Sequence, residues 1–172
     1  MRAKHLVTLI AAAGVSGWLF ASDHGERHGL PVPANPAWRA ECGSCHIPYP
    51  PALLPERSWR TLMGGLDRHF GENAALDDAA RRQITEFLAA NAADRVDARR
   101  ARKAAAAIAP AATPLRISET PWFERKHDEL RADVWARKEV GSRANCAACH
   151  RGAENGRFDE DEVAVPRARR GA

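Results

Sequence analysis

Two five-residue motifs of the same form, Cys-x-x-Cys-His, constrain this chain of 172 residues more than any other feature. The first runs from Cys42 to His46, and the second runs from Cys146 to His150. Because residues three and four apart lie on one face of a helical turn, both thiols of a motif can reach one flat ligand, with the histidine beside them. This spacing is the attachment signature of c-type haem: two thioethers hold the porphyrin, and the histidine binds the iron.

Zinc binding and thiol redox chemistry fit these motifs less well than haem attachment does. Zinc sites also use paired Cys-x-x-Cys motifs, but a zinc module does not need a histidine after each second cysteine. Thioredoxin-like redox motifs belong to a βαβ pattern, which surrounds neither motif. The two motifs contain all four cysteines of the chain, Cys42, Cys45, Cys146 and Cys149. We therefore expect two covalently bound haem c groups, each with its iron, and no cysteine is left for a disulfide or a nucleophile.

The N-terminus has the plan of a secretory signal. Arg2 and Lys4 precede an uncharged apolar run over residues 6–21, and a polar stretch follows. The run is short for a membrane span, which needs about 20 apolar residues. We expect a signal peptide over residues 1–21 and a periplasmic location, because haem is attached to cysteine outside the bacterial cytoplasm. Leu19 is a poor residue three positions from the cleavage site, so an uncleaved anchor with peripheral membrane association is the alternative.

The charge of the chain does not indicate a nucleic-acid partner. Lys and Arg number 26 and Asp and Glu number 22, for a net charge of +4. Without residues 1–21 the charge falls to +2, and four ionised haem propionates would bring it to about −2. No motif of interleaved aromatic and basic residues is present either. We expect no nucleic-acid binding.

The rest of the chain, residues 22–172, is long enough for one domain of about 150 residues. We expect a first haem segment over residues 38–93, a linker helix over residues 94–115 and a second haem segment over residues 116–166. Apolar residues recur at helical spacing in several segments. The expected fold class is all-α: a small helical di-haem cytochrome c with extended loops packed around its two haems.

The first haem segment contains two predicted helices. Apolar residues at helical spacing predict a helix that starts near Pro55 and carries His69 on its apolar face, with Gly71 as its natural stop. Asp77 or Asp78 is expected to cap a second helix, which ends at about residue 92.

The linker and the second segment contain one predicted helix each. Alanine and arginine favour a helix in the linker, which we expect to be largely exposed and to end before Pro110. Its basic run, residues 99–103, is more typical of a solvated face than of a docking patch for an acidic partner. In the second segment, Thr120 and Pro121 predict the start of a helix whose apolar face includes His127 and Val134.

Counting histidines gives candidate axial ligands. The seven histidines are His5, His24, His28, His46, His69, His127 and His150. His46 and His150 belong to the motifs. His69 lies 23 residues after His46, and His127 lies 23 residues before His150. We expect His46 and His69 to bind the first iron and His127 and His150 to bind the second.

Other ligand sets stay open at this stage. The distal histidines could be exchanged between the two haems. Met63 competes with His69 at the first haem. His24 and His28 lie in a proline-rich lead-in. They could serve as axial ligands, but exposed residues of a tail are the more ordinary interpretation.

Ligation by two protein side chains bears on function. An iron held in this way has no open position for oxygen or peroxide, and its ready reaction is one-electron exchange. Two histidines also lack the methionine ligand that raises the potential of ordinary cytochromes c. We expect a carrier of single electrons rather than an enzyme. The alternative is a small haem enzyme, or a gas-binding or sensor protein, with one labile axial ligand.

Several stretches together resemble the bacterial periplasmic di-haem cytochromes c of the type called DHC. They are CGSCH (42–46), LLPERSW (53–59), HFG (69–71), TPWFERKH (120–127), GSRANCAACH (141–150) and FDEDEVAVP (158–166). The resemblance implies a helical di-haem fold, electron transfer, and bis-histidine ligation with His69 and His127 as distal ligands. It also implies two partners. One is a small high-spin monohaem cytochrome, the sphaeroides haem protein, and the other is a membrane b-type cytochrome that supplies electrons.

Overall fold

The computed structural model describes residues 29–167, and this part of the chain is helical. Its α-helices are α1 (Pro36–Cys42), α2 (Glu56–Met63), α3 (Asp78–Ala90), α4 (Arg99–Ala106), α5 (Pro121–Lys126) and α6 (Ala132–Trp135). Its short 3₁₀ turns are η1 (Pro51–Leu53), η2 (Leu66–Arg68), η3 (Ile117–Glu119), η4 (Cys146–Ala148), η5 (Ala153–Asn155) and η6 (Glu160–Glu162). Between residues 29 and 167 there are only isolated β-bridges and no strand. The expected all-α fold class is confirmed.

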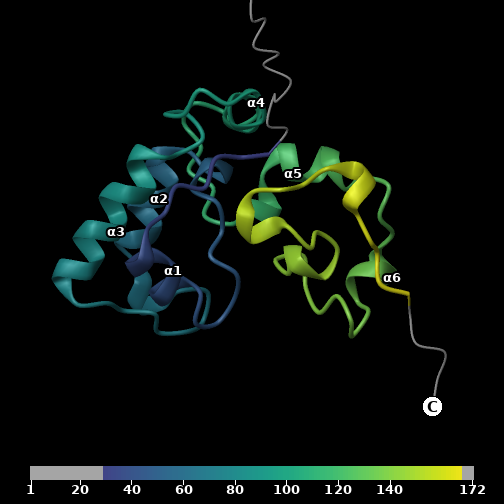
Figure 1. Cartoon of the computed structure of the whole chain (residues 1–172), viewed down its shortest axis with the longest axis horizontal. Coiled ribbons are helices and arrows are strands. Elements are labelled where there is room, and N and C mark those ends of the chain that lie inside the picture. The colour runs from purple at the N-terminus through teal and green to yellow at the C-terminus, as the bar shows by residue number, and fades with distance from the viewer. Residues whose placement is uncertain (1–28, 168–172) are drawn as a thin grey trace, which may run out of the picture.

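The described residues form two halves joined by a linker. We call residues 29–98 the first half and residues 116–167 the second half. Figure 1 shows α1, α2 and α3 packed together on one side, the shorter elements of the second half on the other, and α4 above them. No helix within the described range is long and apolar enough to cross a membrane. The expected signal peptide, His24 and His28 lie outside the described residues.

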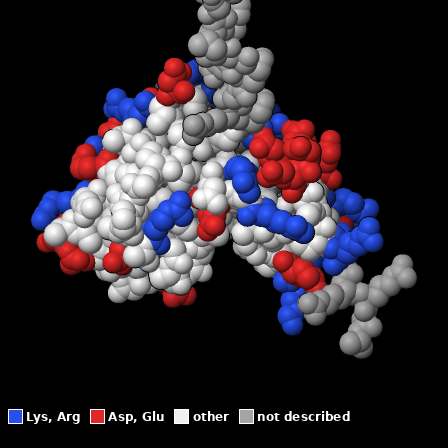
Figure 2. Space-filling model, in the orientation of Figure 1, with Lys and Arg blue, Asp and Glu red and all other residues white. Residues whose placement is uncertain are grey.

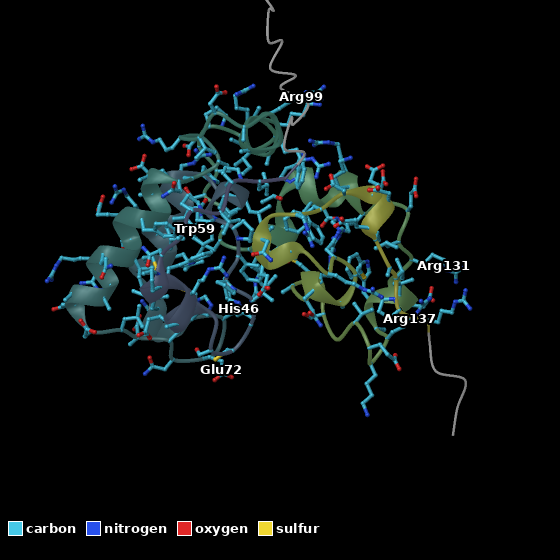
Figure 3. All side chains as sticks on the ribbon, in the orientation of Figure 1. His46, Trp59, Glu72, Arg99, Arg131 and Arg137 are labelled. Atoms are coloured by element: carbon cyan, nitrogen blue, oxygen red, sulfur yellow. The ribbon has the colours of Figure 1, made fainter. Side chains whose placement is uncertain are left out.

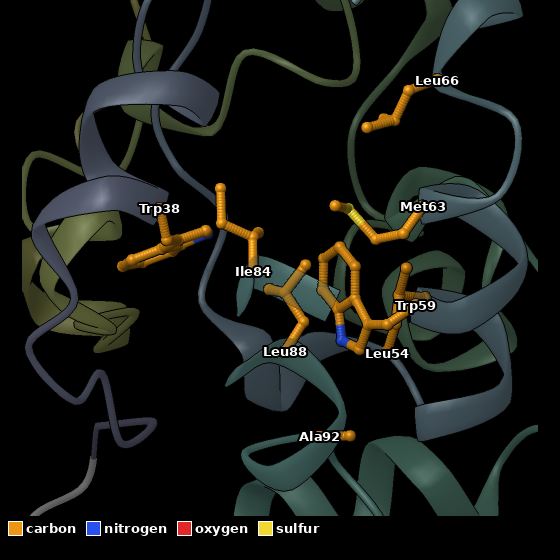
Figure 4. Close-up of a cluster of buried hydrophobic side chains, with 8 residues drawn as sticks. All are labelled: Trp38, Leu54, Trp59, Met63, Leu66, Ile84, Leu88 and Ala92. Carbon is orange, nitrogen blue, oxygen red and sulfur yellow. The ribbon is translucent and has the colours of Figure 1, made fainter. Parts of the chain in front are cut away.

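The first half has a hydrophobic core between α1, α2 and α3. Trp59 is 5% exposed, and its indole Nε1 donates a hydrogen bond of 2.7 Å to the carbonyl oxygen of Pro51. Figure 4 shows the eight side chains of this core: Trp38, Leu54, Trp59, Met63, Leu66, Ile84, Leu88 and Ala92. Burying large apolar side chains stabilises a fold by roughly 1.5–3 kcal/mol each. The core therefore gives the first half its own source of stability.

Helix α2 is shorter than the periodicity predicts. It starts after Pro55, as expected, but it ends at Met63, and Gly64 caps it. Two consecutive glycines have little preference for a helix, so the chain turns here and continues as η2. The prediction of one helix up to Gly71 is wrong. His69 follows η2 on a separate turn.

Helix α3 agrees closely with its prediction. The side chain of Asp77 accepts hydrogen bonds from the backbone N–H groups of Ala79 and Ala80, at 2.9 and 3.0 Å. This cap satisfies donors that a helix N-terminus leaves without partners. Ile84 and Leu88 are buried against the core. α3 thus forms one wall of the first half.

Helix α4 is more buried than expected. Ala101 and Ala104 are 0% and 3% exposed, and Ala101 belongs to a second cluster with Leu30, Ala52, Leu53 and Ala93. Alanine lets a helix approach closely, which is why the arginine-rich helix lies against the protein on one side. The prediction of a largely exposed linker helix is wrong for this face. Its basic side chains lie on the other face, where Arg99, Arg102 and Lys103 are exposed.

The helix predicted from Thr120 is also shorter than expected. The Thr120 side chain accepts a hydrogen bond from the backbone N–H of Phe123 and caps α5, but α5 ends at Lys126. The Nδ1 atom of His127 donates to the carbonyl oxygen of Phe123 at 2.8 Å. The backbone N–H of His127 donates instead to the carbonyl oxygen of Glu124, at 3.1 Å. The side chain thus takes the acceptor that continues a regular helix, and Val134 lies on the separate helix α6.

Candidate functional site

The first motif lies at the end of α1, on the side of the first half that faces the second. Cys42 is the last residue of α1, and Cys45 and His46 follow in the next turn. His69 reaches the same place from the turn after η2. The rings of His46 and His69 are 6.2 Å apart between centroids and inclined by 26°. Figure 3 shows His46 between the two halves.

The second motif lies in a tight turn around η4. The backbone N–H of His150 donates to the carbonyl oxygen of Cys146 at 2.8 Å, which brings the ends of the motif together. His127 reaches this motif from the end of α5. The rings of His127 and His150 are 6.0 Å apart between centroids and inclined by 85°. Each motif therefore has one further histidine opposite its own.

These separations fit two imidazoles on one metal ion. Metal–imidazole bonds of about 2 Å, plus the reach from each nitrogen to its ring centre, place two opposed rings about 6 Å apart. Among the described residues, no group of three or more His, Cys, Asp or Glu side chains converges on one point. Each pair could therefore supply two ligands, whereas structural zinc takes four. The donor set fits an iron whose other ligands come from a porphyrin.

Hydrogen bonds fix the tautomer of one histidine at each site. The Nδ1 atom of His46 donates to the carbonyl oxygen of Ile47 at 2.7 Å. His127 makes the corresponding bond to Phe123. Because a carbonyl oxygen only accepts, each Nδ1 carries a proton, and Nε2 is the nitrogen left to bind a metal.

A cavity of about 750 Å³ lies at the first site and reaches the second motif at Cys146. Its lining includes Cys42, Cys45, His46 and His69 from the first site and Cys146 from the second. Most of its wall is apolar, as is usual for a cofactor site.

Two arginines also line this cavity. Arg116 and Arg143 come from the second half. Nε of Arg143 is buried and has no hydrogen-bond partner in the described structure, although its Nη2 atom pairs with Glu124 at 2.7 Å. Guanidinium groups bind carboxylates well, so these side chains suit a ligand that carries propionates, as haem does.

Burial changes the protonation of several site residues. It raises the pKa of the Cys42 and Cys146 thiols to about 11. It also lowers the pKa of His69 and of His150, and in each pair the neighbouring histidine adds to the effect. A lowered pKa favours the neutral imidazole, which is the form that binds a metal.

The turn that carries His69 is strained. Phe70 has a φ of +54°, in the left-handed region that large side chains rarely adopt, and Gly71 follows with a φ of +104°. The guanidinium carbon of Arg116 lies 3.9 Å from the Phe70 ring centroid. The backbone N–H of Glu72 closes the turn by donating a hydrogen bond of 3.0 Å to the backbone carbonyl oxygen of His69. The stacked arginine and the closing hydrogen bond hold Phe70 in place.

Two residues of the site, Tyr49 and Arg143, were not predicted from the sequence. Tyr49 stacks on His46, with centroids 4.6 Å apart and planes inclined by 23°. Arg143 lies over the Phe123 and Trp135 rings, at 5.3 and 5.4 Å. The sequence contained a signal for Tyr49, since it is the only tyrosine and lies three residues after His46. It contained none that separates Arg143 from the other arginines.

Comparisons with known proteins identify the family of this chain. The family model of dihaem cytochrome c matches residues 38–158. A solved diheme cytochrome c from Rhodobacter sphaeroides is 52% identical, with a TM-score of 0.66 over 74% of this chain and 98% of that one. A second, from Shewanella baltica, is 39% identical, with a TM-score of 0.64 over 78% of this chain and 95% of that one. A search of curated proteins finds no match. The chain belongs to the dihaem cytochrome c family and is therefore an electron-transfer haem protein with two covalently bound haem c groups.

Proposed function

We propose that this protein is a periplasmic carrier of single electrons in which both irons are bound by two histidines. His46 and His69 would bind the first iron, and His127 and His150 the second. The observation that carries the proposal is the pair of opposed imidazoles at each motif, 6.2 and 6.0 Å apart. Because each motif has such a pair, the proposal requires no further ligand.

The chemistry follows from a filled coordination shell. A bound haem supplies an iron that cycles between the ferrous and ferric states. The chain's own histidines would hold that iron at two positions and leave no vacant position for a substrate. We therefore propose that the protein is not an enzyme.

Met63 is the competing ligand at the first site. Its side chain is 2% exposed and packs in the core with Trp59 and Leu66. It also lines the cavity. The opposition of His69 to His46 supports His69 as the ligand, and the packing of Met63 supports a role in the core.

The location and partners are part of the same proposal. The basic start and apolar run of residues 1–21 support export to the periplasm. After export this segment is either cleaved as a signal peptide or kept as an anchor. We propose a small high-spin monohaem cytochrome of the sphaeroides haem protein type as the electron acceptor. A membrane b-type cytochrome is the proposed donor. Both follow from the family resemblance, and neither involves nucleic acid.

One observation favours a second candidate, a haem with a labile ligand. The left-handed conformation of Phe70, directly after His69, costs on the order of 1–3 kcal/mol. If this turn relaxed to relieve the strain, His69 would move away from the iron. A gas-binding, sensing or enzymatic site would follow, and exposure to carbon monoxide distinguishes it from a carrier.

Single substitutions of the distal histidines test the carrier proposal. We expect His69→Ala and His127→Ala each to convert one haem to the high-spin state, seen in the absorption spectrum of the oxidised protein. Met63→Leu is the control, and we expect two low-spin haems in it. An unchanged low-spin spectrum in either histidine variant would contradict the assignment of that ligand.

A further inference from the structure

Tyr49 connects the two haem sites. It comes from the loop after the first motif, and its ring stacks on His46. Its hydroxyl donates a hydrogen bond of 2.7 Å to the carbonyl oxygen of Ala144, a residue 95 positions further along the chain. Ala144 lies two residues before Cys146. One side chain thus contacts the histidine of the first motif and the segment that begins the second.

The acceptor of this bond extends the connection to the second motif itself. The carbonyl oxygen of Ala144 also accepts a hydrogen bond of 2.9 Å from the backbone N–H of Cys146. A continuous series of contacts therefore runs from His46 through the Tyr49 ring and hydroxyl to Ala144 and on to Cys146. Tyr49 and Cys146 also line the same cavity.

The loop around Tyr49 holds it in a fixed position. Pro48 and Pro50 flank it, and both are buried. Proline fixes the backbone φ, so this loop has few alternative conformations. The tyrosine ring packs against both hydrophobic clusters of the molecule. Such a rigid setting suits a residue whose role is to keep two sites at a constant separation.

We propose that Tyr49 is a positioning residue that couples the two haem sites and sets the rate of electron exchange between them. This inference rests on the proposed function, in which both irons are low-spin electron carriers. Exchange moves one electron: one ferrous iron becomes ferric as the other ferric iron becomes ferrous. Tyr49 keeps its proton and is not oxidised, so it acts through contact alone.

Two variants and a matched control test the proposal in the holoprotein. Tyr49→Phe keeps the ring on His46 and removes the hydrogen bond to Ala144, whereas Tyr49→Leu removes both contacts. Phe158→Leu is the control, because Phe158 packs beside the other motif histidine, His150, at 5.3 Å between ring centroids. The control therefore alters an aromatic contact at the second motif and keeps the contact between Tyr49 and His46.

The measurement is the rate of internal electron exchange in half-reduced protein, obtained from exchange broadening of the haem methyl NMR signals. We expect Tyr49→Phe to slow exchange several-fold, Tyr49→Leu to slow it further, and Phe158→Leu to leave it unchanged. Equal rates in wild type and Tyr49→Phe would overturn the proposal, and so would equal slowing in the Phe158→Leu control. If Tyr49→Leu does not assemble with haem, Tyr49→Phe decides the result.

Absorption spectra of the same samples separate this inference from the proposed function. A high-spin haem in the wild-type protein would contradict the carrier proposal. Two low-spin haems in every sample, with exchange insensitive to Tyr49, would contradict only the role of Tyr49. The thermal unfolding midpoint of each variant shows whether a change in exchange accompanies a loss of stability.

Discussion

The two halves of the molecule carry the same motif but support it differently. In the first half, eight buried side chains form a core between three helices. The second half has only short elements, and its buried apolar residues are few and scattered: Phe123, Val134, Val140, Cys149 and Ala153. Its helices α5 and α6 have six and four residues.

This difference implies that the cofactors have unequal structural roles. Isolated helices this short are not stable in water, and the second half has little apolar surface of its own to bury. Aromatic rings surround its histidine pair: the ring centroids of Phe123 and Trp135 lie 4.0 and 5.8 Å from that of His127. We therefore expect the first half to keep its fold without a haem and the second half to fold around one.

Removal of one attachment site at a time tests this difference and has the largest expected effect. The double substitution Cys146→Ala and Cys149→Ala prevents attachment of the second haem. We expect amides throughout the second half to lose their protection from hydrogen exchange, measured by mass spectrometry. The matched substitutions Cys42→Ala and Cys45→Ala should leave α3 protected, because its Ile84 and Leu88 pack in the core of the first half.

Truncation of one tryptophan in each half gives the next largest effect. Trp59 is buried in the core, so Trp59→Ala should cost about 3–5 kcal/mol of unfolding free energy. Trp135 is half-buried, and Trp135→Ala should cost about 1–2 kcal/mol. Denaturant unfolding of both variants measures the two costs. Equal costs would show that the second half has a core as effective as that of the first.

Two surface carboxylates give the smallest effect. Glu56 accepts hydrogen bonds from Arg60 and Arg95, which lower its pKa, and Arg131 and Arg137 lower the pKa of Asp133 in the same way. A carboxylate whose pKa is lowered by folding stabilises the folded state at pH values above its ordinary pKa. This contribution disappears as the pH falls through the lowered pKa.

We therefore expect Glu56→Gln and Asp133→Asn to lower the thermal unfolding midpoint slightly at pH 7. At about pH 3, where both carboxylates in the unfolded chain are protonated, the difference from wild type should shrink. Thermal scans at the two pH values measure this. A difference that grows on acidification would contradict the sign of both pKa shifts.

Local signals were read correctly from the sequence. The two motifs, the cap of α3 at Asp77 and the start of α5 at Thr120 depend on a few neighbouring residues, and all are visible in the printed sequence. The structure also brings His69 to His46 and His127 to His150, as the counting of histidines suggested. Ligation of the irons by these four side chains stays a prediction.

The wrong predictions concern helix ends and tertiary contacts, which the spacing of apolar residues does not determine. The end of α2 depends on Gly64 and Gly65, and the end of α5 depends on a hydrogen bond from the His127 side chain. Ala101 and Ala104 do fall on one face of α4 among basic residues, but alanine is also common on exposed helix faces, so this spacing does not show that the face is buried. The bond between Tyr49 and Ala144 joins residues 95 positions apart, and no local pattern predicts it.

The most direct test of two bis-histidine haems is the low-temperature EPR spectrum of the oxidised protein. The rings are nearly parallel at the first site and nearly perpendicular at the second, inclined by 26° and 85°. Parallel ligand planes act on the same iron d orbital and give a rhombic low-spin signal, whereas perpendicular planes give a more anisotropic one. We expect these two low-spin signals, no high-spin signal, and no binding of carbon monoxide after reduction. A high-spin signal, or binding of carbon monoxide, would contradict ligation of both irons by histidine pairs.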